Sequence, residues 1–375
     1  MSVTQRIRVF QVIECGGPGG AGSQVAAICS RLDPKRFEVS LVYATRPGCE
    51  PQAYRAQATG IANAYFIPEM TREISPGRDL AAFRKLKELF KTEKPEVVHA
   101  HSSKAGGLAR PAAKFAGVPR IFYSPHGYSF QMQDRRRTSR CGYRLAERVL
   151  SKIGTVVACS PSEAEAARSL GAKNVATVCD AFLGQLPPVN GAKPSKGIRI
   201  GACGRLTFAR HPEAFVKLAQ RATDSRNGVG FVWIGDGELR GTVDEMITDM
   251  NLRNRLELTG WLDSGGVRQR LAGLDLFVHF SRWEGLPNAV LEAMANGLAV
   301  VASDIPGNRD LISSGENGYL VGSEIELLER TLELIDQPDL RKQMGERGRR
   351  RVESDYLPDK MIASLERLYL GESSR

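Results

Sequence analysis

The sequence predicts an α/β protein with two Rossmann-like domains, each a doubly wound parallel sheet. Its 375 residues are enough for two hydrophobic cores. Short apolar runs alternate with amphipathic helical stretches along the chain, an order that produces a parallel sheet. Residues 186–197 are rich in Pro, Gly and polar residues, which is typical of a linker. We therefore expect an N-terminal domain over 1–185, a C-terminal domain over 198–355 and a final segment over 356–375.

The N-terminal domain is predicted from an ordered series of strands and helices. The series is strand Arg6–Ile13, helix Ser23–Leu32, strand Phe37–Tyr43, helix Leu80–Lys91 and strand Val97–His101. Between the first strand and the first helix, Gly17, Gly19 and Gly22 spell G-x-G-x-x-G, so a dinucleotide-binding loop is one alternative. The next strand ends in Leu41–Arg46 without the acidic residue that would bind a ribose diol, which disfavours NAD.

Histidines follow two strands of this domain. His101 ends the strand Val97–His101 and is followed closely by Lys104, and His126 follows the strand that begins near Ile121. Ligands bind at the carboxyl ends of strands in open α/β sheets, so this position favours a functional role over a structural histidine. For Lys104 a solvated lysine is the default, and a phosphate of the acceptor is the alternative.

The positive charge lies in the N-terminal half. The chain has a formal net charge of +10, and residues 1–185 contribute 27 Lys and Arg against 15 Asp and Glu. On a helix, Arg140, Arg144, Arg148 and Lys152 would form one basic stripe beside apolar residues. The alternative without a binding role is a solvated helix face. No nucleic-acid-binding module is recognisable, so we expect no nucleic acid and favour an anionic membrane surface or a lipid diphosphate.

The segment Ser281–Gly297 places two carboxylates around one turn between a strand and a helix. The strand over Leu274–Phe280 precedes it, and a helix is expected from Asn288 to Ala295, ending at Asn296 and Gly297. Glu284 then lies in the loop and Glu292 on the helix. Free amides at a helix start attract anions, and carboxylates accept hydrogen bonds from hydroxyls. This combination suits a nucleotide sugar.

Longer motifs support that interpretation. The segment Glu284-Gly-Leu-Pro-Asn-Ala-Val-Leu-Glu-Ala-Met-Ala, followed by Val300–Gly307, resembles the E-x(7)-E motif of the retaining family-4 glycosyltransferases, which have the GT-B fold of two domains facing across a cleft. The segments His101-Ser-Ser-Lys-Ala-Gly and Pro125-His-Gly resemble members that build capsules, O-antigens and exopolysaccharides. The resemblance covers nearly the whole chain.

The resemblance implies roles for individual residues. Glu284 would contact the transferred sugar, His126 would lie near sugar and acceptor, and Arg205 with Arg210, which replaces the family's lysine, would neutralise the diphosphate. The remaining donor-binding residues would be Gly16, Gly17, Gly235, Gly260, Trp261, Gly285, Leu286, Pro287, Asn288 and Glu292. The acceptor-binding candidates are His101, Lys104, Arg140, Arg144 and Arg148. A final helix near 359–370 would return to the first domain.

We therefore expect a retaining hexosyltransferase that uses a nucleoside-diphosphate sugar, with UDP favoured over GDP, and a lipid-linked glycan acceptor. The alternatives are a GT-B epimerase or phosphorylase and a non-catalytic scaffold that binds the donor. No cofactor is expected, and no metal, because there is no D-x-D motif and the seven cysteines are scattered. The N-terminus has no apolar signal region, so a cytoplasmic protein, peripheral on the membrane, is expected.

Overall fold

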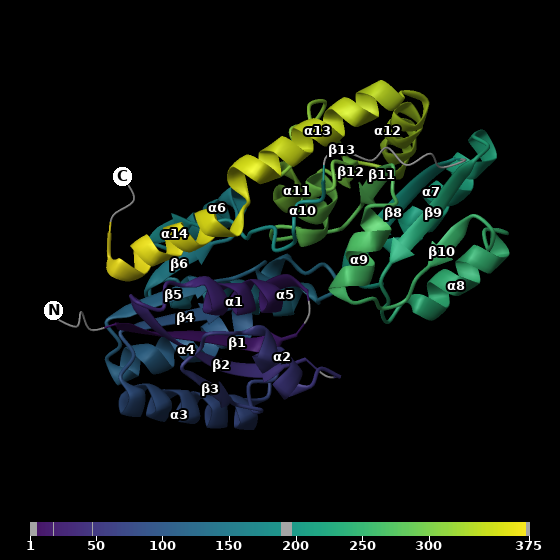
Figure 1. Ribbon diagram of the computed structural model, residues 1–375. Helices are drawn as coiled ribbons and strands as arrows, with labels where there is room; N and C mark the ends of the chain where they lie inside the picture. Colours follow the sequence, from purple (N-terminus) through teal and green to yellow (C-terminus); the bar gives the residue numbers. More distant parts are fainter. Residues whose placement is uncertain (1–5, 18, 47, 189–196, 373–375) are drawn as a thin grey trace. The chain divides into compact units, whose positions relative to one another are not determined.

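The chain forms two compact α/β units (Figure 1). This computed structural model describes residues 6–17, 19–46, 48–188 and 197–372. The N-terminal unit comprises Met1–Leu183 with Pro358–Arg375, and the C-terminal unit comprises Gly184–Leu357. Residues 189–196 of the expected linker lie outside the described residues.

The N-terminal unit is built on a seven-stranded parallel sheet. Its order is β3 (Asn63–Phe66), β2 (Phe37–Thr45), β1 (Ile7–Gly16), β4 (Val97–His101), β5 (Arg120–Ser124), β6 (Thr155–Ala158) and β7 (Val175–Thr177). Its helices are α1 (Gly20–Arg31), α2 (Pro51–Gln57), α3 (Pro76–Glu93), α4 (Ser103–Ala116), α5 (Arg137–Leu150), α6 (Pro161–Ser169) and α14 (Pro358–Leu370). The strand order reverses between β1 and β4, which makes this pair the switch point of the sheet.

Alternation along the strands divides the core of this unit into two layers. Val9 and Ile13 of β1 pack with α1 and α14, whereas Phe10 and Val12 pack with α3 and α4. Side chains two apart on a strand share a face. Gln11 therefore lies on the α1 and α14 side, and Figure 1 shows α14, in yellow, along this unit.

The C-terminal unit repeats the architecture with six parallel strands. Their order is β10 (Leu256–Leu258), β9 (Val229–Ile234), β8 (Ile198–Cys203), β11 (Leu276–His279), β12 (Ala299–Ser303) and β13 (Gly318–Val321). The helices are α7 (Pro212–Ser225), α8 (Arg240–Asp249), α9 (Ser264–Leu271), α10 (Asn288–Ala295), α11 (Pro306–Arg309), α12 (Glu324–Asp336) and α13 (Pro338–Asp355). Here the order reverses between β8 and β11. Two parallel doubly wound sheets confirm the predicted fold class.

The predicted elements agree with the structure where the periodicity is strong. The strand Val97–His101 and the helix Asn288–Ala295 have the expected bounds. The basic stripe needs a correction: α5 ends at Leu150 with Ser151 as its C-cap, so Lys152 lies beyond the helix and does not continue the row of arginines. Among the described residues, none of the helices is both long and apolar enough to cross a membrane.

One buried ion pair holds α5 to the N-terminal unit. Glu147 is the buried residue of α5, and its carboxylate accepts hydrogen bonds from Arg110 Nη2 at 2.9 Å and from Tyr123 Oη at 2.7 Å. The guanidinium of Arg110 lies 3.7 Å from the Tyr123 ring centroid and also donates to the carbonyls of Gly106 and Leu150. Because every buried charge here has a partner, the desolvation of both ions is offset.

Replacing Glu147 with Leu should destabilise the N-terminal unit by about 3–5 kcal/mol, because the buried Arg110 would lose its counterion. Chemical denaturation monitored by circular dichroism measures the loss. Asp336→Leu, which breaks the exposed pair of Asp336 with Arg226, is the control and should leave the midpoint unchanged. Equal midpoints for the two variants would show that the Glu147 pair does not anchor α5.

Candidate active site

The candidate residues gather at the switch point of each sheet. In the N-terminal unit, β1 ends at Gly16 and β4 at His101, and in the C-terminal unit, β8 ends at Cys203 and β11 at His279. In an open parallel sheet the loops after such neighbouring strands diverge and leave a crevice for a ligand. Each unit therefore presents one candidate site.

Glu284 lies in the loop after β11 between two nitrogen-bearing side chains. His279 Nε2 is 3.0 Å from Glu284 Oε1, and Arg210 forms an ion pair with the same oxygen. Burial, reinforced by the charge of Arg210, lowers the pKa of His279 well below its usual value, so His279 is a neutral hydrogen-bond donor. Burial also lowers the pKa of Arg210, to about 10, which still leaves it cationic at neutral pH. The carboxylate is thus held in one orientation with one oxygen engaged.

The loop that carries Glu284 is fixed to the loop after β8. The backbone N–H of Arg282 donates to Ala209 O at 2.8 Å, and the guanidinium of Arg282 lies 3.9 Å from the centroid of the Phe208 ring. Arg210 Nη1 is also 3.4 Å from Ser281 Oγ. These contacts bring the predicted residues Glu284 and Arg210 together, although 74 positions separate them in the chain.

A glycine allows the next helix to approach this loop closely. A Cβ atom at Gly307, in α11, would lie 2.6 Å from Gly285 O and 3.1 Å from Glu284 Cβ. The loop over Gly285, Leu286 and Pro287 leads directly into α10, whose N-cap residue, Pro287, provides no side-chain cap. The start of α10 therefore lies directly after the loop that carries Glu284.

Glu292 is the second carboxylate of the motif and has a different environment. It lies in α10, and within the described part of the chain its carboxylate has neither a hydrogen bond nor an ion pair. Burial raises its pKa to about 7, and the charge of Arg268 lowers it only in part. Glu292 is half-buried, and a partly desolvated acid without a partner is an arrangement typical of binding sites.

The other donor-binding candidates of this unit surround β8 and β9. Gly235 has φ +133°, and a Cβ atom there would lie 2.3 Å from Gly204 O, so only glycine fits. Gly235 and Gly260 form an isolated backbone bridge, and the Trp261 side chain beside them is 65% exposed. Arg205 is exposed and lies 3.4 Å from Glu238, and its charge contributes to the lowered pKa of Arg210.

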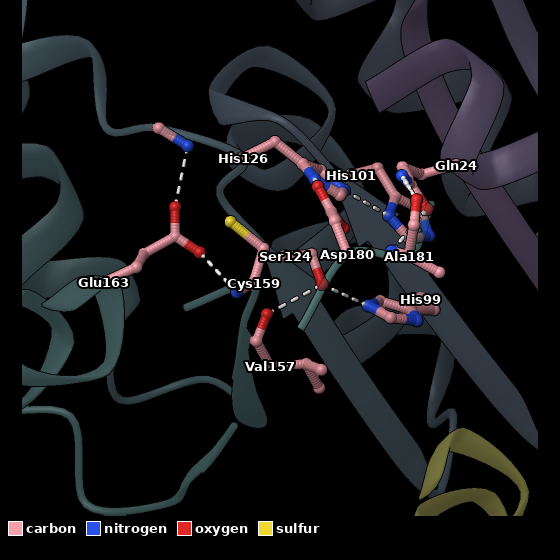
Figure 2. A network of polar contacts seen from close by, with 11 residues as sticks. Gln24, His99, His101, Ser124, His126, Val157, Cys159, Glu163, Asp180 and Ala181 are labelled. Atoms are coloured by element: carbon pink, nitrogen blue, oxygen red, sulfur yellow. Dashed lines mark hydrogen bonds and ion pairs between the residues drawn. The ribbon is translucent and has the colours of Figure 1, made fainter. Parts of the chain in front are cut away.

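In the N-terminal unit the structure brings His101 and His126 into direct contact (Figure 2). His101 Nδ1 is 3.0 Å from His126 Nε2, and His126 Nδ1 is 3.1 Å from Asp180 Oδ2. Asp180 follows β7, so three different strands deliver these side chains to one edge of the sheet. The pair His126 and Asp180 is nearly inaccessible to solvent.

The backbone turn at His126 is held by Glu163. His126 has φ +50° and Gly127 φ +94°, so the turn uses two consecutive left-handed residues. Glu163 Oε1 accepts from Gly127 N at 2.7 Å and its Oε2 from Cys159 N at 2.8 Å (Figure 2). Ser160 caps α6 by accepting from Glu163 N at 3.2 Å. The Ser160 cap therefore also sets the position of the carboxylate that holds the turn.

The glycine loop adjoins a buried acid. Glu14, near the end of β1, accepts hydrogen bonds from Ser102 Oγ and from Ala105 N, and burial raises its pKa. Gly16 follows on the same strand, where a Cβ atom would lie 2.5 Å from the Tyr54 ring, and Gly17 has φ +146°. The helix after the loop begins at Gly20, earlier than the predicted Ser23.

The acceptor-binding candidates are dispersed. Lys104 Nζ binds both carboxylate oxygens of Asp79, at 2.7 and 2.9 Å, and is largely buried, so it is not a free surface lysine. Arg140 Nε donates to Phe130 O at 2.9 Å, and Arg144 lies over the Phe130 ring. Arg148, further along α5, is exposed. The structure therefore brings His101 and His126 together but separates Lys104 from the α5 arginines.

His126, Cys159 and Asp180 each offer a ligand atom within 4.8 Å of the others, a grouping that the sequence did not reveal. Burial, with the nearby charges of Glu163 and Asp180, raises the pKa of the Cys159 thiol well above its usual value. A neutral thiol binds metals poorly, and both ring nitrogens of His126 have protein partners. We interpret the group as a hydrogen-bonded cluster.

Several residues of both sites carry no recognisable motif. They are Gln11, Glu14, His99, Asp180, His279 and Tyr369. Glu14, Asp180 and His279 lie at or just after the ends of strands, and that position is the signal that would have found them. Tyr369 has no such signal, because it reaches the N-terminal sheet from α14.

Two family models match the chain, one in each unit. Residues 18–179 match the model described as Glycosyltransferase Family 4, and residues 188–351 match the model described as Glycosyl transferases group 1. Together they span nearly the entire described chain. The second match includes Glu284 and Glu292, and the first includes His101 and His126 but not Asp180.

Two curated relatives that match most of the chain have names from glycan synthesis. The chain is 29% identical over 326 residues to the Escherichia coli UDP-Gal:alpha-D-GlcNAc-diphosphoundecaprenol alpha-1,3-galactosyltransferase, covering 82% of this chain and 83% of that protein. It is 26% identical over 340 residues to LpsE of Rhizobium meliloti, a lipopolysaccharide core biosynthesis glycosyltransferase, covering 89% and 90% of the two chains.

Solved structures share the fold at low identity. Anabaena HepE, solved with UDP and glucose, superposes with a TM-score of 0.79 at 17% identity, covering 98% of this chain and all of that one. The sucrose-phosphate synthase of Thermosynechococcus elongatus gives a TM-score of 0.80 at 17% identity, covering 98% and 99% of the two chains. From the two family models, the relatives and the paired Rossmann-like units, this chain belongs to the family-4 glycosyltransferases of the GT-B fold.

Proposed function

We propose that the protein is a retaining hexosyltransferase that moves a sugar from a nucleoside diphosphate, preferably UDP, to a hydroxyl of a lipid-linked glycan precursor. The observation that carries the proposal is the contrast between the two glutamates around α10. Glu284 is held by Arg210 and His279, whereas the half-buried Glu292 has no hydrogen-bond or ion-pair partner within the described chain. A ribose diol offers two donors to a carboxylate that lacks them.

Glu284 and its neighbours suit the reacting half of the donor. We assign the sugar hydroxyls to the free oxygen of Glu284. Arg210, the more exposed Arg205 and the amides at the start of α10 would stabilise the charge that develops on the diphosphate. Protein cations and amides supply this stabilisation, so we propose a reaction that needs no divalent metal and no cofactor.

The transfer replaces one bond at the anomeric carbon with another. The acceptor oxygen forms the new glycosidic bond as the bond to the leaving phosphate oxygen breaks, and the acceptor proton passes to that phosphate oxygen. Attack on the same face of the sugar retains the anomeric configuration. Glu284 is tied to two nitrogen-bearing groups, which suits a positioning carboxylate better than a nucleophile.

The choice of donor and acceptor is supported by the relatives. The Escherichia coli protein is named for UDP-galactose and a saccharide linked to diphosphoundecaprenol, and HepE was solved with UDP. We therefore assign UDP-sugar to the C-terminal unit and the lipid-linked acceptor to the N-terminal unit, which carries the basic excess.

Glu292→Gln should abolish nucleotide binding while making the free protein more stable at pH 8. Folding raises the pKa of Glu292 to about 7, so the wild type loses stability as pH rises from about 4.3, the unfolded pKa, to 7. Removing the ionised carboxylate should restore up to about 3 kcal/mol at pH 8 and nothing at pH 4. Thermal unfolding with UDP, GDP, ADP or NAD measures both effects.

In the wild type, one nucleoside diphosphate at about 100 times its dissociation constant should add about 2.7 kcal/mol to stability. Glu257→Gln, an exposed substitution of the same kind, is the control for the variant. A shift with NAD alone would assign the glycine loop to a dinucleotide and contradict the proposal. A nucleotide shift that survives in Glu292→Gln would remove this residue from the donor site.

Glu284→Gln should lower the transfer rate by about 10²–10³. The neutral amide cannot neutralise the charge of Arg210, and it accepts hydrogen bonds from sugar hydroxyls less well than a carboxylate does. Nucleotide binding should persist, since the diol contact is assigned to Glu292. Transfer of radiolabelled sugar from the stabilising donor to extracted lipid-linked saccharides measures the rate. Wild-type transfer by this variant would contradict the role of Glu284 and favour a non-catalytic scaffold.

The exposed face of α5 is our candidate for the anionic membrane surface. Leu145 is 64% exposed and Val149 60% exposed, and Arg144 and Arg148 lie on the same helix. Apolar side chains beside arginines on one amphipathic helix are typical of a helix that lies in a membrane interface. This contact would bring the acceptor's lipid to the N-terminal unit.

Replacing Arg144 and Arg148 with Glu should weaken binding to vesicles of 30% phosphatidylglycerol by at least about tenfold, because each basic residue near the surface contributes about 1 kcal/mol. Co-sedimentation at low and high salt measures the loss, and salt should weaken the wild type in the same direction. Arg253→Glu with Arg255→Glu in the C-terminal unit is the matched control. Equal binding by both double variants would exclude α5 as the contact.

A further inference from the structure

A chain of hydrogen bonds connects seven side chains of the N-terminal unit and ends at His126 and Asp180. Figure 2 labels its members except Gln11 and Tyr369. The chain of bonds begins at the backbone carbonyl of Val157 in β6. From there it passes through Ser124, His99, Tyr369, Gln11, His101, His126 and Asp180. Its members lie in or just after five strands, β1, β4, β5, β6 and β7, and in helix α14.

The carbonyl of Val157 fixes the direction of the first bonds. A carbonyl can only accept, so the hydroxyl of Ser124 donates its single proton to Val157 O at 2.8 Å. Ser124 Oγ is 2.9 Å from His99 Nε2 and has no proton left for it. His99 Nε2 must therefore carry a proton and donate to Ser124.

The donors and acceptors of the hydrogen bonds at Tyr369 follow in the same way. Burial lowers the pKa of His99 to about 3, so its ring holds one proton only, on Nε2. His99 Nδ1 then accepts from Tyr369 Oη at 2.6 Å, which uses the tyrosine proton. Gln11 Nε2 must donate to that oxygen at 3.0 Å, so the other end of its amide, Oε1, accepts from His101 Nε2 at 2.7 Å.

The hydrogen bond between His101 and His126 has a defined donor as well. Burial, with the neighbouring rings of His99 and His126, lowers the pKa of His101 well below its usual value. Its one proton lies on Nε2, so Nδ1 accepts from His126 Nε2 at 3.0 Å. His126 Nδ1 faces Asp180 Oδ2 at 3.1 Å, and one proton must lie between these atoms. Imidazole is more basic than carboxylate by about 2.6 pKa units, so the proton belongs to His126.

We infer that His126 is an imidazolium at neutral pH whose two N–H groups are engaged by Asp180 and His101, so that its side chain provides positive charge and does not act as the general base. Asp180, His101, Gln11 and Tyr369 are positioning residues for it. The catalytic meaning of this charge rests on the proposed function. The protonation state itself does not.

The charges around His126 agree with this assignment. Burial alone would lower its pKa, but Asp180, with Glu163 and Glu14, raises it. His101 faces it as a neutral ring and Cys159 as a neutral thiol. The contribution of the His126–Asp180 pair to the free energy of unfolding is complete below about pH 6.5, the usual pKa of histidine. It is lost as pH rises through the raised pKa of His126.

Nitrogen-15 NMR of the full chain tests the protonation states directly. The protein has five histidines, so single His→Gln variants assign the ring signals. We expect His99 and His101 to show the neutral Nε2–H tautomer from pH 6 to 8 and His126 to show two protonated nitrogens at pH 7. A neutral His126 ring at pH 7 would overturn the inference.

Asp180→Asn supplies the second test. Its amide can donate to His126 Nδ1, so the variant accommodates a neutral ring with the rest of the chain unchanged, and we expect a neutral His126 at pH 7. Sugar transfer should then fall at least tenfold at pH 7.5 and recover towards pH 5.5, whereas the wild type stays flat. An unchanged pH profile would overturn the positioning role of Asp180. Asp336→Asn is the exposed control.

Tyr369→Phe tests the link to α14 independently. Without Oη, the tautomers of His99 and His101 should no longer be fixed, and their spectra should show mixed forms. Unchanged spectra would show that the chain is not continuous. If no donor supports sugar transfer in the wild type, the proposed function fails, while the NMR result still decides the charge of His126.

Discussion

The two candidate sites depend on one topological constraint, the reversal of strand order in a parallel sheet. In each unit the first strand lies next to the strand that begins the second half, and the loops after these two strands run in opposite directions. This arrangement places Glu14 beside Ser102 in one unit, and Arg210 beside Glu284 in the other. Residues far apart in the chain become one site without any long loop.

Each buried charge near these sites is matched by a partner, with one exception. Glu147 binds Arg110, Asp180 binds His126, and Glu284 binds Arg210. These pairs hold side chains in single orientations, which is what a preorganised site requires. The half-buried Glu292 is the exception within the described residues, and the free energy that its partial desolvation costs is available to a ligand that supplies hydrogen bonds.

The sequence was sufficient to predict the fold and the motif around α10, because strong hydrophobic periodicity and the helix-ending residues Asn296 and Gly297 are local signals. It also placed His101 and His126 at strand ends. It could not reveal Asp180 or Tyr369 as their partners, because those contacts depend on which strands become neighbours and on where α14 packs. It also extended the α5 stripe to Lys152, since basic residues continue past the point where the backbone stops being helical.

Tyr369 has a consequence for how the protein is made. It lies in the core of the N-terminal unit, yet in chain order it follows the entire C-terminal unit. During synthesis the strands of the seven-stranded sheet leave the ribosome long before α14. While the second unit is translated, His99 and Gln11 therefore lack the Tyr369 hydroxyl to which both are hydrogen-bonded in the folded protein. The N-terminal histidines therefore reach their final protonation pattern only after the second unit has been made, which ties maturation of one site to completion of the other.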